Sequence, residues 1–253
     1  MSGHSKWASI KHKKAAIDAK RGQLFTKLIK ELTAAARSGG GNMDTNIRLR
    51  AAVTKAKECN MPSDNIDKAI MRGTGELPGV TYEEANYEGY GPAGIAILIE
   101  VVTDNKNRTT AELRNMMSKR GGNMTASGSV SFLFSKKGFI TIEKSAIDEE
   151  KLMTIVLDAG AEDLRTEADT YEVTTQPHDL EAVKAALDKN KIAVQSAEIT
   201  SLPTTTIKIK DKGTAQAILT LMDALEEHED VQHVYANFDI PDELMPDELI
   251  ESE

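Results

Sequence analysis

Residues 95–119 read IAILIEVVTDNKNRTTAELRNMMSK, and the pattern of the chain changes within them. Residues 95–102 form an almost continuous apolar run of strand length, which is typical of a strand buried on both faces. Residues 109–119 then place Leu113, Met116 and Met117 at helical spacing. An aromatic-containing segment at 130–134 predicts the next strand. We therefore expect one β-α-β unit in this region.

The residues before this unit show only helical periodicity. Apolar side chains recur at three- and four-residue spacing between 24 and 36, and again between 47 and 56. We expect Asp44 to cap the second of these helices, Ser63 and Asp64 to cap a third, and Gly73 to end it. The sequence thus predicts that residues 1–80 form a basic, all-helical domain.

The residues after position 135 alternate between strand and helix patterns. Strands expected at 138–143, 162–165, 171–175 and 192–200, with two helices between them, give the β-α-β-β-α-β order of a ferredoxin-like domain. A strand at 206–210, a helix at 217–225 and a strand at 234–240 form a second half-unit that needs a partner. We predict a mixed α+β fold in which the helical domain is followed by two ferredoxin-like α+β domains. Residues 136–203 are inserted in a discontinuous domain made of 81–135 and 204–241, and 242–253 form an acidic tail.

Composition excludes several classes of protein. The chain has 253 residues, and no apolar run approaches the roughly 20 residues that a membrane-spanning helix needs, so no membrane contact is expected. Cys59 is the single cysteine, which excludes a disulfide-stapled secreted protein and fits a reducing compartment. The first residues are polar and basic, with no apolar core of a signal peptide. We expect a protein of the bacterial cytoplasm.

The net charge of −9 is unevenly distributed along the chain. Residues 1–80 carry 15 basic and 7 acidic side chains (+8), residues 81–144 carry 8 and 7 (+1), and residues 145–253 carry 8 and 26 (−18). Within residues 1–30, eight bases are opposed by Asp18 alone, which favours a polyanionic partner. The alternative is that this segment is a solvated arm whose charge serves solubility.

The candidate nucleic-acid contacts are the bases of this segment, those of the second predicted helix, and two in the loop after residue 102. Trp7 joins them because an indole among lysines can stack on an unpaired base, although it can equally anchor the arm on the helical core. In full, the set is Lys6, Trp7, Lys11, His12, Lys13, Lys14, Lys20, Arg21, Lys27, Arg48, Arg50, Lys55, Lys57, Lys106 and Arg108. Backbone amides at 103–108 and 119–123 can bind anions, or they can simply cap helices.

The sequence lacks the motifs of the common enzyme classes. The glycines of GYGPAG at 89–94 precede a strand, whereas a dinucleotide-binding turn must follow one. There is no GK[ST], HExxH or G-x-S-x-G motif. His228 and His233 flank a helix-to-strand turn without a third ligand nearby in sequence, and are expected at the surface. We expect no enzyme activity, no cofactor and no metal site.

Three stretches together resemble the YebC family: MSGHSKWASIKHKKAAIDAKRGQLFTKLIKEL, RLRAAVTKAKECNMPSDNIDKAI and YEGYGPAGIAILIEVVTDNKNRT. The resemblance spans nearly the whole chain and implies a helical domain followed by two α+β domains, one inserted in the other. The chain departs from the family pattern at Asn42 and Met43, at Ile47, and at Met124 and Thr125, where the local loop geometry is therefore in question.

The resemblance implies a DNA-binding regulator of transcription, whereas the mitochondrial relatives imply a translational activator and the bacterial members imply a link to ribosomes. In a ribosome-associated translation factor, the basic arm would contact ribosomal RNA. The acidic net charge, and the absence of a recognition helix at helix-turn-helix spacing, favour RNA on physical grounds. A protein-interaction module without nucleic acid remains the third alternative. The expectation is a non-enzymatic, cytoplasmic nucleic-acid-binding regulator of gene expression, with DNA and ribosomal RNA both open as its target.

Overall fold

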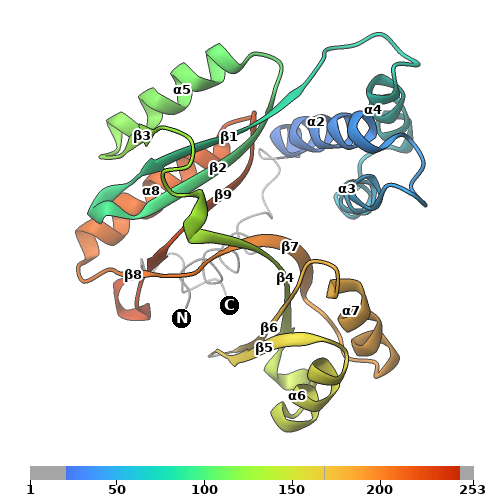
Figure 1. The fold of residues 1–253 in the computed structure, drawn as a ribbon, viewed down its shortest axis with the longest axis vertical. Helices are drawn as coiled ribbons and strands as arrows, with labels where there is room; N and C mark the ends of the chain where they lie inside the picture. Colours follow the sequence, from blue (N-terminus) through green and yellow to red (C-terminus); the bar gives the residue numbers. More distant parts are fainter. Residues whose placement is uncertain (1–20, 168, 246–253) are drawn as a thin grey trace. The chain divides into compact units, whose positions relative to one another are not determined.

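A computed structural model describes residues 21–167 and 169–245. The chain divides into two compact units, Phe132–Thr205 and a second unit that contains the segments on either side of it (Figure 1). Among the described residues, no helix combines the length and the apolar character that crossing a bilayer requires. The predicted mixed α+β fold class is confirmed.

The second unit begins with three helices, α2 (Arg21–Gly39), α3 (Ile47–Glu58) and α4 (Ser63–Thr74). Their apolar stripes form one core, in which Leu32, Leu49 and Ala69 are fully buried. Gly73 allows α4 to approach α2 closely, because a Cβ at this position would lie 2.5 Å from the carbonyl oxygen of Thr33. The helical part expected before residue 80 therefore has its own core.

Three of the predicted helix-end assignments differ from the structure. Asn46, not Asp44, is the N-cap of α3, because its Oδ1 accepts from the Leu49 amide at 3.0 Å. The Asn46 amide group also donates to the carbonyls of Ala35 and Gly40, both at 2.8 Å, which fixes the loop between α2 and α3. The N-cap of α4 is Pro62, not the predicted Ser63 or Asp64, and in the described part of the chain it forms no side-chain capping hydrogen bond. The helix continues through Gly73 and ends where Gly75 adopts the left-handed conformation.

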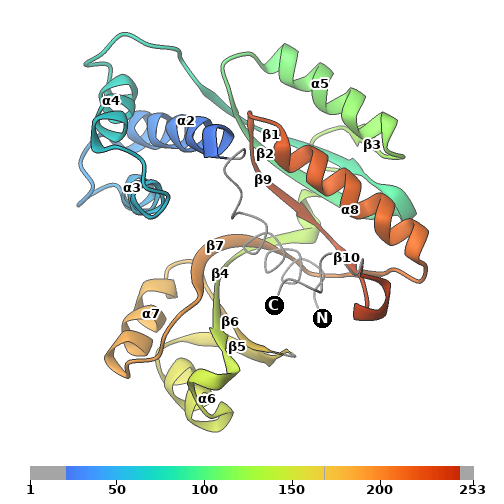
Figure 2. The ribbon, with the colours of Figure 1, turned by 180° about the vertical axis from the view of Figure 1, so that it is seen from behind.

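The α+β part of this unit contains one four-stranded antiparallel sheet in the order β3-β1-β2-β9. Its strands are β1 (Glu83–Tyr90), β2 (Ala96–Thr103), β3 (Asn123–Thr125) and β9 (Val231–Ala236). The helices α5 (Lys106–Lys119) and α8 (Lys212–Glu227) cover one face side by side (Figure 2). Two short strands, β8 (Ile207–Lys208) and β10 (Phe238–Asp239), form a separate parallel pair.

The order of these strands is not the one expected from the sequence. Residues 131–133 form a 3-10 turn where a strand was expected, and β3 takes that place in the chain. The sheet position beside β2 is occupied by β1, whereas β8 pairs outside the sheet. Strand β1 was missed because its residues, EEANYEGY, are mostly polar, and only Glu88 and Gly89 are fully buried in it.

The inserted unit has the ferredoxin-like order that the sequence predicts. It contains β4 (Phe134–Glu143), α6 (Glu149–Asp158), β5 (Ala161–Thr166), β6 (Thr170–Thr175), α7 (Leu180–Lys189) and β7 (Ser196–Pro203). All neighbours in the sheet β5-β6-β4-β7 are antiparallel. The core contains Ile140 and Ile142 of β4, packed with Leu152 and Leu187 of the helices. Strand β7 starts later than predicted, because residues 192–195 precede its pairing with β4.

Candidate nucleic-acid interface

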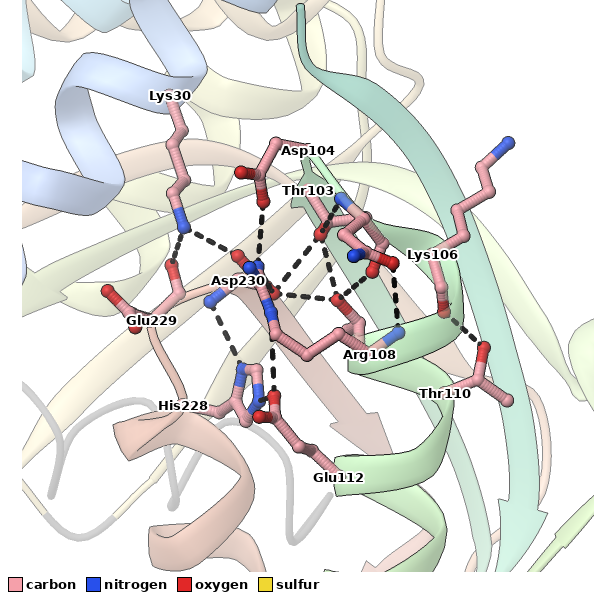
Figure 3. A network of polar contacts seen from close by, with 12 residues as sticks. Lys30, Thr103, Asp104, Lys106, Arg108, Thr110, Glu112, His228, Glu229 and Asp230 are labelled. Carbon is pink, nitrogen blue, oxygen red and sulfur yellow. Dashed lines mark hydrogen bonds and ion pairs between the residues drawn. The ribbon is translucent and has the colours of Figure 1, made fainter. Parts of the chain in front are cut away.

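The carboxylate of Asp230 is the centre of a polar network in the turn between α8 and β9 (Figure 3). This side chain is fully buried, and Oδ1 accepts from Lys30 Nζ of α2 at 2.5 Å. Oδ2 accepts from Arg108 Nη2 at 2.9 Å, Thr109 Oγ1 at 2.7 Å and Thr103 Oγ1 at 3.1 Å. One carboxylate thus connects α2, the end of β2 and the start of α5.

Local sequence explains how β2 leads into α5 at this point. Asn105 is the N-cap of α5 and accepts from the Arg108 amide at 3.1 Å. Thr103 Oγ1 accepts from the Asn105 amide at 3.0 Å, so the loop closes on itself. These contacts favour the capping interpretation of the 103–108 loop over an anion site. The second predicted anion turn is similar, because the Arg120 and Gly122 amides both donate to the carbonyl of Met117.

Opposing effects act on the pKa of Asp230. Burial alone would raise the pKa, but hydrogen bonds from Lys30, Thr109 and Arg108 outweigh it and hold the pKa well below its ordinary range. The carboxylate therefore stays ionised between its two cationic partners. Such a pair orders the groups around it more than it adds to net stability, because both charges lose their water.

Lysines of α2 also bond to carbonyl groups in the last turn of α8 and just after it. Lys27 Nζ donates to the Glu226 carbonyl at 2.5 Å, and Lys30 Nζ donates to the Glu229 carbonyl at 3.1 Å. Carbonyls at a helix C-terminus lack partners within the helix and carry a partial negative charge. The two lysines thus connect α2 to the end of α8.

Glu112, His228 and Asp230 form a group of metal-ligand types, with one ligand atom of each within 4.8 Å of the others. His228 Nδ1 accepts from the Asp230 amide at 3.1 Å, which places its proton on Nε2, 2.9 Å from Glu112 Oε2. Because Asp230 already binds the cationic groups of Lys30 and Arg108, a metal ion would meet two positive charges. The arrangement fits an ion-pair network better than a metal site.

Three of the predicted phosphate contacts are bound to carboxylates. Arg48 forms two bonds with Glu31, at 2.7 and 3.0 Å, and one with Glu84 at 2.7 Å. Lys106 Nζ lies 2.7 Å from Glu83, and Arg108 also contacts Asp104 at 2.7 Å. These ion pairs must break before the three basic side chains can bind phosphate.

A basic surface remains on α3. Lys55 and Lys57 are exposed near the end of the helix, and among the described residues they contact no acid. Arg50 is exposed as well, and its side chain donates, within the described part of the chain, only to the carbonyl groups of Met43 and Asp44, at 2.9 and 2.8 Å. We call Arg50, Lys55 and Lys57 the α3 basic surface.

Of the remaining predicted contacts, the structure describes the position of Arg21, which is the first residue of α2. The following lie outside the described residues: Lys6, Trp7, Lys11, His12, Lys13, Lys14 and Lys20. The structure therefore brings together only part of the predicted set.

The sequence pattern did not predict the residues around Asp230 that take part in this network. Asp230 stands in a strongly acidic stretch, EEHED, and nothing in that pattern distinguishes the buried acid from its exposed neighbours. His228, expected at the surface, has a side chain only 10% exposed. Both depend on contacts with residues more than 100 positions away, which single-sequence periodicity does not detect.

Comparison with known proteins gives matches over nearly the whole chain. Residues 5–76 match the model described as the TACO1/YebC protein N-terminal domain, and residues 82–238 match the TACO1/YebC second and third domain. A protein of Syntrophobacter fumaroxidans named "Probable transcriptional regulatory protein" is 55% identical over 97% of this chain and 98% of its own. One of the same name from Persephonella marina is 54% identical with the same coverage.

A solved structure agrees with these matches. The crystal structure of a conserved hypothetical protein from Aquifex aeolicus matches with a TM-score of 0.81 at 46% identity. The match covers 92% of this chain and 96% of that one. The resemblance predicted from the three sequence stretches is confirmed, and the chain belongs to the TACO1/YebC family.

Proposed function

We propose that this chain is a non-enzymatic, cytoplasmic regulator of gene expression that binds nucleic acid through the α3 basic surface together with the basic N-terminal segment. The observation that carries the proposal is the uneven use of the basic residues. Lys55 and Lys57 have no acidic partner among the described residues, whereas Arg48, Lys106 and Arg108 are held by carboxylates. Lysines that remain available in a chain of net charge −9 suit contacts with phosphate.

The names of the relatives support the regulatory part of this proposal. Proteins that share more than half of their residues with this chain are called probable transcriptional regulatory proteins. Duplex DNA is therefore the first target to test.

A second candidate, a ribosome-associated translation factor that binds ribosomal RNA, is favoured by the charge on α4. The helices α3 and α4 are joined by four residues, as a helix-turn-helix pair would be. In such a pair the N-terminal residues of the second helix contact the bases. Here that end of α4 carries Asp64, which is paired with Lys68 at 2.6 Å, and Asp67, so it presents carboxylates and no unpaired cation to DNA phosphates among the described residues. Phosphate contacts from α3 without base readout suit structured RNA equally well.

The test removes the charge from the α3 basic surface. Lys55→Gln with Lys57→Gln should weaken binding and lower the slope of log affinity against log salt by about 1.8 on duplex DNA or about 1.4 on a single strand, for two lost phosphate contacts. The matched control is Lys151→Gln with Lys189→Gln, which removes the same charge from exposed positions of the inserted unit. Equal slopes for the two double variants would refute a role for α3.

Co-sedimentation with ribosomes distinguishes the two targets. Purified protein is pelleted with ribosomes across a salt series, with and without excess duplex DNA. Salt-sensitive pelleting that survives the DNA supports the translation factor, and loss of pelleting to the DNA supports the transcriptional regulator. If the protein binds neither ribosomes nor free nucleic acid, the proposal fails and a protein-interaction module takes its place.

A further inference from the structure

A second cationic site lies in the helical part, at the last turns of α2 and α4. The segment 75–82, which leads from α4 towards β1, closes a hollow of about 350 Å³ with these turns. Its wall contains Arg37 of α2 and Arg72 of α4, together with Thr81 and Tyr82. Its volume is near the lower end of the range of small-ligand sites.

The two arginines of the hollow differ from the arginines of this unit that form ion pairs. Among the described residues, the guanidinium group of Arg72 has no hydrogen-bond or ion-pair partner. The guanidinium group of Arg37 donates only to the Tyr82 carbonyl in the described part of the chain, at the long distance of 3.4 Å, and it interacts with Glu83 only through longer-range electrostatics. By contrast, Arg48 and Arg108 are each held by two carboxylates within 3.0 Å. The hollow therefore presents two guanidinium groups without an ion-paired acid.

The backbone adds further donors to this wall. The amides of Gly75 and Leu77 donate to carbonyls of α4. In the part of the chain that the structure describes, no hydrogen bond is formed by the amides of Gly79, Val80 and Thr81. Guanidinium groups and consecutive free amides are the donors that proteins use to bind phosphate oxygens.

We propose that this hollow binds the phosphate group of a nucleotide, with Arg37 and Arg72 as the phosphate ligands and the Tyr82 side of the hollow next to the nucleoside. The phosphate can come from a free mononucleotide or from one unit of a single-stranded RNA. The site does not depend on the α3 basic surface, so it stands or falls separately from the proposed function.

The arginines also have a structural explanation. Each lies in the last turn of its helix, where a cation offsets the partial negative charge of the terminal carbonyls. That role accounts for the charge but requires neither a hollow nor unbonded amides. It predicts that both arginines affect helix stability slightly and bind no ligand.

Calorimetric titration of the full-length protein separates these explanations. The probes are inorganic phosphate, AMP, adenosine as the phosphate-free control, and a short oligouridylate. We expect AMP to bind and adenosine to bind at least about tenfold more weakly, since a hydrogen bond to a charged group is worth about that factor or more. Oligouridylate that binds more tightly than AMP identifies RNA as the source of the phosphate, and the reverse order identifies a free nucleotide.

Arg37→Gln with Arg72→Gln should weaken binding of the phosphate-bearing probe by at least about tenfold per arginine. The control, Arg114→Gln with Arg165→Gln, removes the same charge from exposed positions elsewhere and should leave this affinity unchanged. The proposal is overturned if no phosphate-bearing probe binds the wild-type protein, or if the arginine variant binds it as well as the control does.

A second variant keeps the test decisive should the arginine variant not fold. Gly79→Leu retains every charge but crowds Arg72, because even a Cβ at position 79 would lie 3.0 Å from its Cγ. We expect this variant also to lose affinity for the phosphate-bearing probe. Unchanged binding would show that the ligand lies elsewhere, and would overturn the proposal independently of the nucleic-acid experiments on Lys55 and Lys57.

Discussion

The buried carboxylate of Asp230 receives hydrogen bonds from four side chains that belong to three elements, α2, β2 and α5. Lys30 is 200 residues away, and its ammonium group also lies 6.0 Å from the centre of the Tyr82 ring. Because both members of the pair are buried, each charge depends on the other to offset the hydration that it has lost. The Asp230 carboxylate, together with the carbonyl contacts of Lys27 and Lys30, thus fixes how α2 meets the end of α8.

Replacing this acid tests that dependence. Asp230→Asn should lower the free energy of unfolding by about 3–5 kcal/mol, because it leaves Lys30 buried without a counter-charge. Urea denaturation measures the effect, and Glu112→Gln, at an exposed neighbour, should cost less than about 1 kcal/mol. In a double-mutant cycle, Lys30→Met should cost much less in the Asp230→Asn background, and strict additivity would refute the coupling.

The same pair predicts a dependence on acid. The folded-state pKa of Asp230 is depressed from its ordinary value of 3.8, so its contribution to stability is present above that value. The contribution is lost as the pH falls from about 4 towards the lower folded-state pKa. The stability difference between wild type and Asp230→Asn should therefore be constant from pH 5 to 8 and shrink below about pH 4. A difference that changes around pH 6 instead would show that a group other than Asp230 is responsible.

Glu88 provides a second residue-scale test. Its carboxylate is buried in β1 and accepts from the amides of Gly128, Val130 and Ser131, at 2.8, 2.6 and 3.0 Å. Glu88→Gln offers one acceptor oxygen in place of two and should cost about 2–3 kcal/mol. Hydrogen exchange should become faster at the Val130 and Ser131 amides. Glu84→Gln is the control, since it removes only a partly exposed ion pair with Arg48.

The contribution of Glu88 to stability changes with pH in the same direction as that of Asp230. Burial raises the pKa of Glu88, but the three amide donors outweigh it and hold the pKa below its ordinary value of 4.5. The carboxylate thus stabilises the fold above about pH 4.5, and this contribution declines as the pH falls further. Loss of protection at these amides only above pH 7 would contradict this assignment.

At the scale of the elements, the sequence predicted correctly those helices and strands whose buried face shows as an apolar pattern in the local sequence. The helices α2, α6, α7 and α8 follow from their apolar stripes, and β2 follows from its continuous run. Strand β1 failed because Glu88 is buried by amides from residues 128–131, a contact that no local pattern predicts. Asn46 was missed as a cap because its amide also bonds to Ala35, eleven residues earlier.

The candidate site could be predicted only in part, for a related reason. The charge count identified the basic helical part, and α3 does present Lys55 and Lys57. The count could not separate these from Arg48, whose partners Glu31 and Glu84 lie 17 and 36 residues away. Availability of a charge depends on tertiary pairing, which one sequence does not display.

Gly73 tests the packing of α4 on α2, and Gly22 serves as a comparison because it has no such contact. Gly73→Ala places a Cβ 2.5 Å from the Thr33 carbonyl oxygen and 2.7 Å from Ala36 Cβ, so it should destabilise the protein by about 1–3 kcal/mol. Gly22→Ala, near the start of α2, meets no atom within 4 Å and should stabilise by about 0.5–1 kcal/mol. Thermal unfolding of both variants checks the sign, and a stable Gly73→Ala would show that the helices can separate without cost.

At the scale of the whole molecule, charge follows the division of the chain. The unit Phe132–Thr205 holds 8 basic and 14 acidic side chains, a net charge of −6, whereas residues 1–80 hold +8. Contact with phosphate is therefore expected to be concentrated in the helical part. The inserted unit is better suited to other contacts, and this predicts that nucleic-acid affinity survives its removal.

We expect the two units to be separable by deletion, because the insertion begins and ends at neighbouring positions. Phe134 pairs with Pro203, and the Thr204 amide donates to the Leu133 carbonyl at 2.8 Å. The cores are also separate, since the core of the split α+β part contains no residue of 132–205, and the core of the insertion contains only residues 140–197.

Replacing residues 132–205 by a short Gly-Ser linker should therefore leave a protein that unfolds cooperatively, and the excised segment should fold alone. Circular dichroism and amide NMR spectra of both pieces, compared with the intact chain, provide the measurement. The deletion variant should also retain its salt-dependent affinity for nucleic acid within about threefold, with the Lys55→Gln and Lys57→Gln variant as reference. Poorly dispersed spectra for either piece would show that the units depend on each other for folding, and would refute the predicted division into domains.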